Sequence, residues 1–88
     1  MQHEVWIPAL HRDLTHGQET VQVAGETLGE LIANLDALFP GLADRLTEDG
    51  RVRPYISVAV NGEVIGRRLG QRLEQPSEVH FVPAIGGG

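Results

Sequence analysis

The chain ends in three consecutive glycines, Gly86, Gly87 and Gly88, and this pattern has the clearest chemical use in the sequence. Glycine lacks a Cβ, so a terminal glycine segment can enter a channel that is too narrow for other side chains. The reactive group at such an end is the α-carboxylate of Gly88. A free carboxylate is ionised at neutral pH and is a poor electrophile, so a second protein must activate it before any transfer.

Length and composition predict one small globular domain. The chain has 88 residues, of which 41% are hydrophobic and 22% are charged. The apolar residues are spread through periodic runs, which is typical of a folded chain. A domain of this size has little room for both a core and a deep active site that excludes water. These features favour a carrier or a binding partner over an enzyme.

The charge of the chain argues against nucleic acid as a direct ligand. Twelve acidic residues against seven arginines give a formal net charge of -5. A phosphate-backbone binder normally presents a basic surface instead. Arg67 and Arg68 lie in a local basic cluster and are candidates for a partner interface, although charges on loops are more commonly just solvated.

Two residue types that support many reactions, cysteine and lysine, are absent from the chain. Disulfides, thiolate metal sites and cysteine nucleophiles are therefore excluded, and so are homopolymers linked through lysine. The histidines have no recognised ligand spacing, so we expect no metal site and no bound cofactor. The N-terminal residues lack the pattern of a signal peptide, and no apolar run approaches the ~18 residues of a membrane span. We expect a cytoplasmic protein that does not bind a membrane.

Strands must position the glycine end, and alternating apolar residues predict five of them. The predicted strands cover residues 5–10, 18–24, 55–60, 63–65 and 79–82. Asn61-Gly62 predicts a tight hairpin, because both residues tolerate a positive φ. Pro83 is expected to end the last strand, since proline has no N–H to donate.

One main helix is predicted between the second and third strands. Thr27 and Glu30 have the spacing of a capping box, in which the Thr27 hydroxyl accepts from the Glu30 amide and the Glu30 carboxylate accepts from the Thr27 amide. Apolar residues then recur at three-and-four spacing until Pro40-Gly41 stops the helix. Residues 42–46 are expected to form a short helical turn, and Asp49-Gly50 a loop.

The element order is strand, strand, helix, strand, strand, strand, which predicts one α+β domain with a mixed sheet of four to five strands wrapped over the helix. We place this domain at residues 1–83 and a flexible, glycine-rich tail at residues 84–88. At about 3.3 Å per residue, five tail residues reach roughly 17 Å. That length is enough to enter the pocket of a neighbouring enzyme while the folded domain stays outside.

Two segments resemble the MoaD/ThiS family of ubiquitin-like sulfur carriers. Val60-Asn61-Gly62-Glu63 is similar to the central hairpin of the family, and residues 81–88 are similar to its last strand, proline and terminal glycine pair. The resemblance spans the domain and implies the β-grasp fold. Family members often have a second proline where this chain has Ala84. Residues 6–10, and the helix followed by residues 40–42, especially resemble the CysO-like branch that supplies sulfur for cysteine synthesis.

The resemblance implies a reaction at Gly88. An E1-like adenylating enzyme would use ATP to form an acyl-adenylate, and a sulfur donor would displace AMP to leave a thiocarboxylate for a sulfur-accepting synthase. Gly87 and Gly86 would give backbone clearance in the partner's channel, while Ile85 and Ala84 would make apolar contacts at its mouth. The chain is then a protein co-substrate, or the small subunit of a synthase complex, rather than an enzyme.

Two further residues are candidates for the partner interface, and alternatives remain for the sulfur recipient and for the function. Phe81 and Pro83 join the two arginines as candidate partner contacts. We expect the sulfur to be used in the synthesis of cysteine, molybdopterin or thiamine, or in tRNA thiolation, and we favour the cysteine route. The chain is alternatively a ubiquitin-like modifier joined to target proteins through its C-terminus, or a noncatalytic β-grasp interaction module. The glycines would then be an incidental chain end, since termini are commonly disordered.

Overall fold

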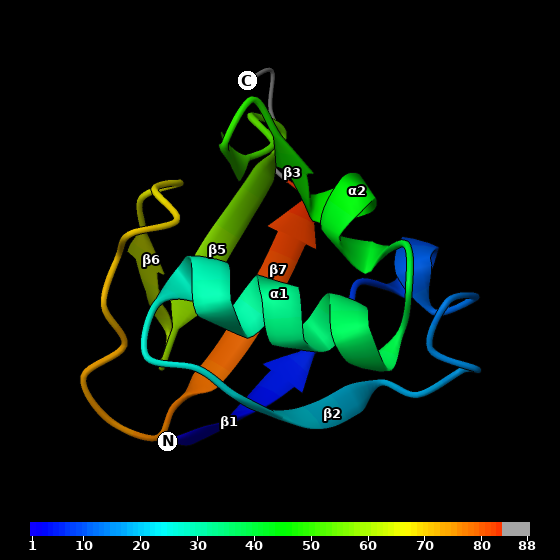
Figure 1. Cartoon of the computed structure of the whole chain (residues 1–88), viewed down its shortest axis with the longest axis horizontal. Coiled ribbons are helices and arrows are strands. Elements are labelled where there is room, and N and C mark those ends of the chain that lie inside the picture. Colours follow the sequence, from blue (N-terminus) through cyan, green and yellow to red (C-terminus); the bar gives the residue numbers. More distant parts are fainter. Residues whose placement is uncertain (84–88) are drawn as a thin grey trace.

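A computed structural model of the chain describes residues 1–83 (Figure 1). Helix α1 (Leu28–Leu38) crosses one face of a five-stranded sheet. The strand order in the sheet is β2-β1-β7-β5-β6. Its strands are β1 (Gln2–Trp6), β2 (Thr20–Ala24), β5 (Ile56–Val60), β6 (Glu63–Ile65) and β7 (Glu78–Pro83). The smaller elements are a 3₁₀ turn (Ala9–His11), α2 (Leu42–Leu46), β3 (Thr47–Glu48) and β4 (Arg51–Val52). The predicted mixed sheet over one main helix is confirmed.

The first and last strands lie side by side at the centre of the sheet. β1 pairs in parallel with β7 and antiparallel with β2, and β7 pairs antiparallel with β5. β6 completes the sheet by pairing antiparallel with β5. The last strand therefore has a neighbour on each side as far as His80, and β5 lies beside its remaining residues.

The core lies between the sheet and α1. Inward residues of β1, β5 and β7 are all 5% exposed or less, and the buried face of α1 meets them. These residues are Val5, Ile56, Val58, Val79, Phe81, Leu28, Leu31, Ile32 and Leu35. Burying an apolar side chain of this kind stabilises the fold by about 1.5–3 kcal/mol. The predicted apolar stripe of the helix is thus confirmed as the face that packs on the sheet.

The first strand ends earlier than its sequence pattern predicts. It stops at Trp6, and residues 9–11 form a 3₁₀ turn in which the His11 amide donates to the Pro8 carbonyl at 2.8 Å. Pro8 cannot donate to a ladder and has a φ of -57°, which suits the start of a turn. The prediction of a strand over residues 5–10 is right only for Val5 and Trp6, because the strand begins at Gln2 and residues 7–10 lie outside it. Leu10 is consequently 79% exposed.

The start of α1 confirms one half of the predicted capping box and corrects the other. The Glu30 amide donates to Thr27 Oγ1 at 3.1 Å. The Glu30 carboxylate accepts from the Glu26 amide at 3.1 Å, rather than from the amide of Thr27. The preceding segment is paired with residues 71–73, with Leu73 N–H donating to the Glu26 carbonyl. This tertiary pairing sets the direction in which the chain enters the helix.

Two of the turns that have consecutive residues with positive φ join paired strands. Asn61 and Gly62 have φ of 51° and 84° and join β5 to β6, as the hairpin prediction required. Asp49 and Gly50 have φ of 55° and 76° and join β3 to β4. The sequence predicted only a loop at the second position, whereas the structure has a two-stranded ribbon there. No helix within residues 1–83 is long and apolar enough to cross a membrane.

Candidate functional site

The glycine segment begins where β7 ends, and its own residues lie outside the described part of the chain. The predictions for Gly88, for Gly87 and Gly86, and for Ile85 and Ala84 therefore stay predictions. The structure does describe the platform that carries them, which we call the tail exit: the last residues of β7 and their immediate neighbours.

The tail exit is held by strand pairing and by the core. Phe81 lies opposite Val58 of β5, and Pro83 lies opposite Ile56. β1 pairs with β7 only as far as His80, so the final residues of β7 have β5 as their strand partner. The side chain of Phe81 is 3% exposed and packs in the core. These contacts anchor the strand just before residue 84.

The burial of Phe81 corrects one candidate in the predicted partner interface. Its side chain faces the core because β7 alternates, with Val79 and Phe81 inward and Val82 outward. Phe81 thus anchors the exit and offers no free surface to a partner. Val82, which is 44% exposed, occupies the outward position instead. The alternation of the strand was the sequence signal that pointed to it. The interface role of Pro83 stays a prediction.

A small apolar hollow lies beside Val82. It has a volume of about 60 Å³ and includes Leu10, Tyr55 and Val82 in its wall. These three side chains are 79%, 56% and 44% exposed, respectively. We call them the exit cluster. The structure thus gathers three apolar residues from separate parts of the sequence around the tail exit, and none of the three was predicted as a site residue.

His11 forms another part of the wall of this hollow. Its side chain is buried, and its Nδ1 has no hydrogen-bond partner among residues 1–83. Burial lowers the pKa of His11, the neighbouring Arg45 lowers it further, and Asp13 opposes the change. The charged form is disfavoured because the imidazole is removed from water beside a guanidinium. At neutral pH His11 is therefore an uncharged wall residue.

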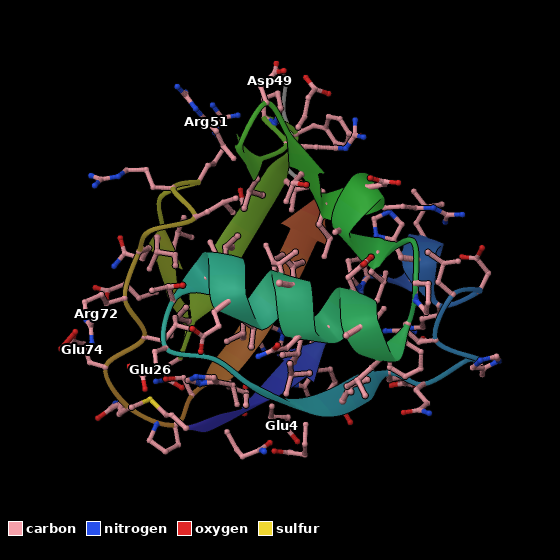
Figure 2. All side chains as sticks on the ribbon, viewed as in Figure 1. Glu4, Glu26, Asp49, Arg51, Arg72 and Glu74 are labelled. Atoms are coloured by element: carbon pink, nitrogen blue, oxygen red, sulfur yellow. The ribbon has the colours of Figure 1, made fainter. Side chains whose placement is uncertain are left out.

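The arginines predicted at a partner interface lie beside the β3–β4 ribbon. Arg67 donates from Nη1 to the Val52 carbonyl at 3.4 Å, and Arg68 forms a β-bridge with Arg51. Figure 2 shows Arg51 and Asp49 at the end of the molecule toward which β7 runs. The structure thus brings Arg68 close to Arg51, and the interface role of Arg67 and Arg68 stays a prediction.

Arg72 occupies a different part of the surface from those arginines. Figure 2 shows it close to Glu26 and Glu74. Its guanidinium lies 3.9 Å from the Glu26 carboxylate and 3.6 Å from that of Glu74. The basic cluster in the sequence therefore separates into Arg67 and Arg68 beside the ribbon and an ion-paired Arg72.

The other histidines whose contacts are described have structural partners. His3 is 1% exposed, with Nε2 at 2.7 Å from the Gly25 carbonyl and Nδ1 accepting from the Ser77 amide at 3.1 Å. His80 stacks on Trp6 with ring centroids 5.0 Å apart. Within residues 1–83 no group of three or more potential ligands is placed to hold a metal ion.

The similarity of this chain to a known family extends over the described domain and the glycine segment. The ThiS family model matches residues 5–88. Sulfur carrier protein CysO of Mycobacterium tuberculosis is 32% identical over 89 aligned positions that cover 96% of each chain. Small archaeal modifier protein 3 of Haloferax volcanii is 36% identical over 64 positions that cover 70% of each chain.

The fold has a close counterpart among solved structures. In the crystal structure of the BexX/CysO complex of Amycolatopsis orientalis, the similar chain has a TM-score of 0.86 and 28% identity, and the match covers 97% of this chain and 98% of that one. The mixed sheet over one main helix is accordingly the ubiquitin-like β-grasp fold. The family model and the full-length relatives agree with this geometry, and the chain belongs to the ThiS family.

Proposed function

We propose that this chain is a sulfur carrier whose C-terminal glycine carries the sulfur as a thiocarboxylate. The observation that supports this most directly is that the family match continues through Gly88, so the glycine segment belongs to the matched region. Full-length similarity to sulfur carrier protein CysO supports the same role. The chain acts as a co-substrate of other enzymes and holds no cofactor of its own.

The chemistry proceeds in two steps on a partner enzyme. The Gly88 carboxylate attacks the α-phosphorus of ATP, pyrophosphate leaves, and an acyl-adenylate forms. A sulfur nucleophile then attacks the carbonyl carbon and displaces AMP, which leaves the thiocarboxylate. ATP is thus used by an E1-like activating partner, and Gly87 and Gly86 give the backbone clearance that a narrow channel requires.

The folded domain contributes to this chemistry by fixing the end of β7, from which the tail extends. The tail exit is anchored by the buried side chain of Phe81 and by the pairing of β7 with β5. A tail that begins at a defined point needs to search only the volume within its own reach, roughly 17 Å for five residues. Holding one reactant in place in this way lowers the entropic cost of the reaction.

The sulfur recipient that we favour is a cysteine-forming synthase. Sulfur carrier protein CysO matches this chain over nearly its full length, and the CysO chain of the solved complex has a TM-score of 0.86. The Amycolatopsis orientalis CysO was crystallised as a complex with BexX, which supports docking of this chain on a partner protein. Enzymes of molybdopterin synthesis, thiamine synthesis and tRNA thiolation are the less favoured recipients.

Protein modification is the second candidate function, because small archaeal modifier protein 3 is 36% identical over 70% of the chain. The same acyl-adenylate would then be attacked by a lysine ε-amine of a target, with AMP leaving and an amide forming. The absence of lysine from the chain means that its own side chains offer no ε-amine for a second copy.

Intact-mass measurement tests the carrier function. The chain is incubated with the E1-like enzyme of its host, ATP and a sulfide source. We expect the mass gain of one sulfur atom replacing one oxygen atom. Gly88→Ala is the matched variant: it should fold normally and be adenylated at least about tenfold more slowly, because a new Cβ must enter the channel.

Two results would contradict the carrier function. One is a chain of unchanged mass after incubation with an activating enzyme that is shown to be active on another carrier. The other, when host proteins are added to the same incubation, is that the chain forms only amides with target proteins, which would favour the modifier function. Normal adenylation of Gly88→Ala would contradict the narrow-channel argument alone.

A further inference from the structure

Exposed apolar side chains are concentrated at the tail exit. Among residues 1–83, six large hydrophobic side chains are exposed, and half of them, Leu10, Tyr55 and Val82, surround one hollow. They come from the 3₁₀ turn, from the segment before β5 and from β7. Singly scattered apolar residues are normal on protein surfaces, but a group rimming a concave site is typical of a binding surface.

The chemistry of the hollow fits an apolar side chain. Pro8 and Ile56 form part of the wall together with the exit cluster, and His11 contributes an uncharged imidazole edge at neutral pH. The volume is about 60 Å³, far below the ~300–1,000 Å³ of a small-molecule pocket. The hollow therefore has room for the tip of one side chain and not for a nucleotide or a cofactor.

The position of the hollow limits which protein can fill it. Val82 lies six residues before Gly88, and the five residues after Pro83 reach roughly 17 Å when extended. An enzyme that acts on the Gly88 carboxylate must bring its active centre within that distance of the tail exit. The rim of the channel that receives the tail therefore comes to lie against the surface beside Val82.

This reasoning rests on the proposed carrier function and deepens it. We propose that the exit cluster, Leu10, Tyr55 and Val82, is the docking anchor for the activating enzyme, and that an apolar side chain at the rim of that enzyme's channel fills the hollow. The cluster positions the carrier before adenylation and takes no part in the chemical step. Loss of the cluster should thus weaken binding without slowing the reaction of the bound carrier.

The test compares the exit cluster with exposed apolar residues of the same types elsewhere. Leu10→Ser and Val82→Thr remove apolar contact at the cluster. Leu38→Ser and Val64→Thr are matched controls, because Leu38 and Val64 are 56% and 69% exposed and do not line the hollow. The activating enzyme is supplied with each variant and ATP, and KM and kcat are measured from pyrophosphate release.

We expect KM for the carrier to rise about tenfold for each cluster variant, the size typical of a residue central to an interface. We expect kcat to stay within about twofold, because the chemical step is unchanged. Both controls should behave as the wild type does. Thermal melting of all four variants separates docking from folding, and Tyr55→Phe, which keeps the ring, should retain the wild-type KM.

Three outcomes would overturn the proposal, and they are distinguishable. Equal KM values for cluster and control variants would remove the docking role and leave the carrier function intact. A wild-type dimer in sedimentation that Leu10→Ser converts to monomer would mean that a second copy occupies the cluster. No adenylation of the wild type by an enzyme active on another carrier would remove the carrier function and this proposal together.

Discussion

In β7, Phe81 packs in the core and the next residue, Val82, faces outward beside Leu10 and Tyr55. Adjacent strand residues point to opposite faces of a sheet, so one position anchors the strand and its neighbour is available for contact. The chain therefore combines a fixed tail exit and a docking surface within two residues. The two functions should separate when each residue is changed.

Phe81→Ala should destabilise the domain by about 3–5 kcal/mol, because it removes a buried aromatic side chain and leaves a cavity. Val82→Ala, its neighbour on the exposed face, should change the free energy of unfolding by less than about 1 kcal/mol. Urea denaturation of the two variants measures both values. Similar losses of stability in the two variants would contradict the assignment of Phe81 as the anchor.

His11 should make the domain less stable in acid. Its pKa in the folded state is lowered from the ordinary value of 6.5, mainly by burial and by Arg45. Below that value the unfolded chain binds a proton that the folded chain resists, so the free energy of unfolding falls as the pH drops. His11→Gln should lose less stability than the wild type between pH 7.5 and pH 5.5 in urea titrations, whereas equal losses would show that His11 titrates normally.

The helix start shows how an element depends on both local and distant contacts. The Thr27 hydroxyl accepts from the Glu30 amide, a contact that spans three residues and follows from the local sequence. The Glu30 carboxylate accepts from the Glu26 amide, in a segment that is paired with residues 71–73. Residues 71–73, which precede β7, thereby fix the position of the segment that enters α1.

Thr27→Ala should lower the free energy of unfolding by about 1 kcal/mol, because the Glu30 amide loses its capping acceptor. Thr27→Ser keeps the hydroxyl oxygen and should remain close to the wild type. The midpoints of urea denaturation at one fixed pH give the comparison. A Thr27→Ala protein as stable as Thr27→Ser would mean that water replaces the cap without cost.

At the scale of the whole molecule, the parallel pairing of β1 with β7 joins the beginning of the domain to its end. Within residues 1–83, the buried hydrophobic core extends from Val5 to Phe81. We therefore expect the folded body and the glycine segment to be separable parts of the chain. One carries stability and docking, and the other carries the reactive group of the proposed function.

Deleting Gly87 and Gly88 should leave the melting temperature within about 2 °C of the wild type, since the core residues are all retained. The shortened chain should not form a thiocarboxylate in the intact-mass assay, although it should still compete with the wild type for the activating enzyme. A shortened chain that kept its full biological function would favour the noncatalytic interaction module.

Much of the fold was predictable because its signals are local. The helix of residues 28–38 follows from three-and-four spacing, and the β5–β6 turn follows from two residues that tolerate positive φ. Residues 5–10 were misjudged in part, because apolar alternation continued in the sequence beyond Trp6 while Pro8 interrupted the strand.

By itself, the sequence determined the order of the main helix and the five strands of the sheet, the glycine segment, and the absence of cysteine and lysine. Only the tertiary structure decided that β1 lies in parallel beside β7, that Phe81 is buried, and that Leu10 and Tyr55 meet Val82. The reason is that periodicity reports which face of an element is apolar, whereas a surface built from three distant segments depends on strand register and on the pairing partners of each strand.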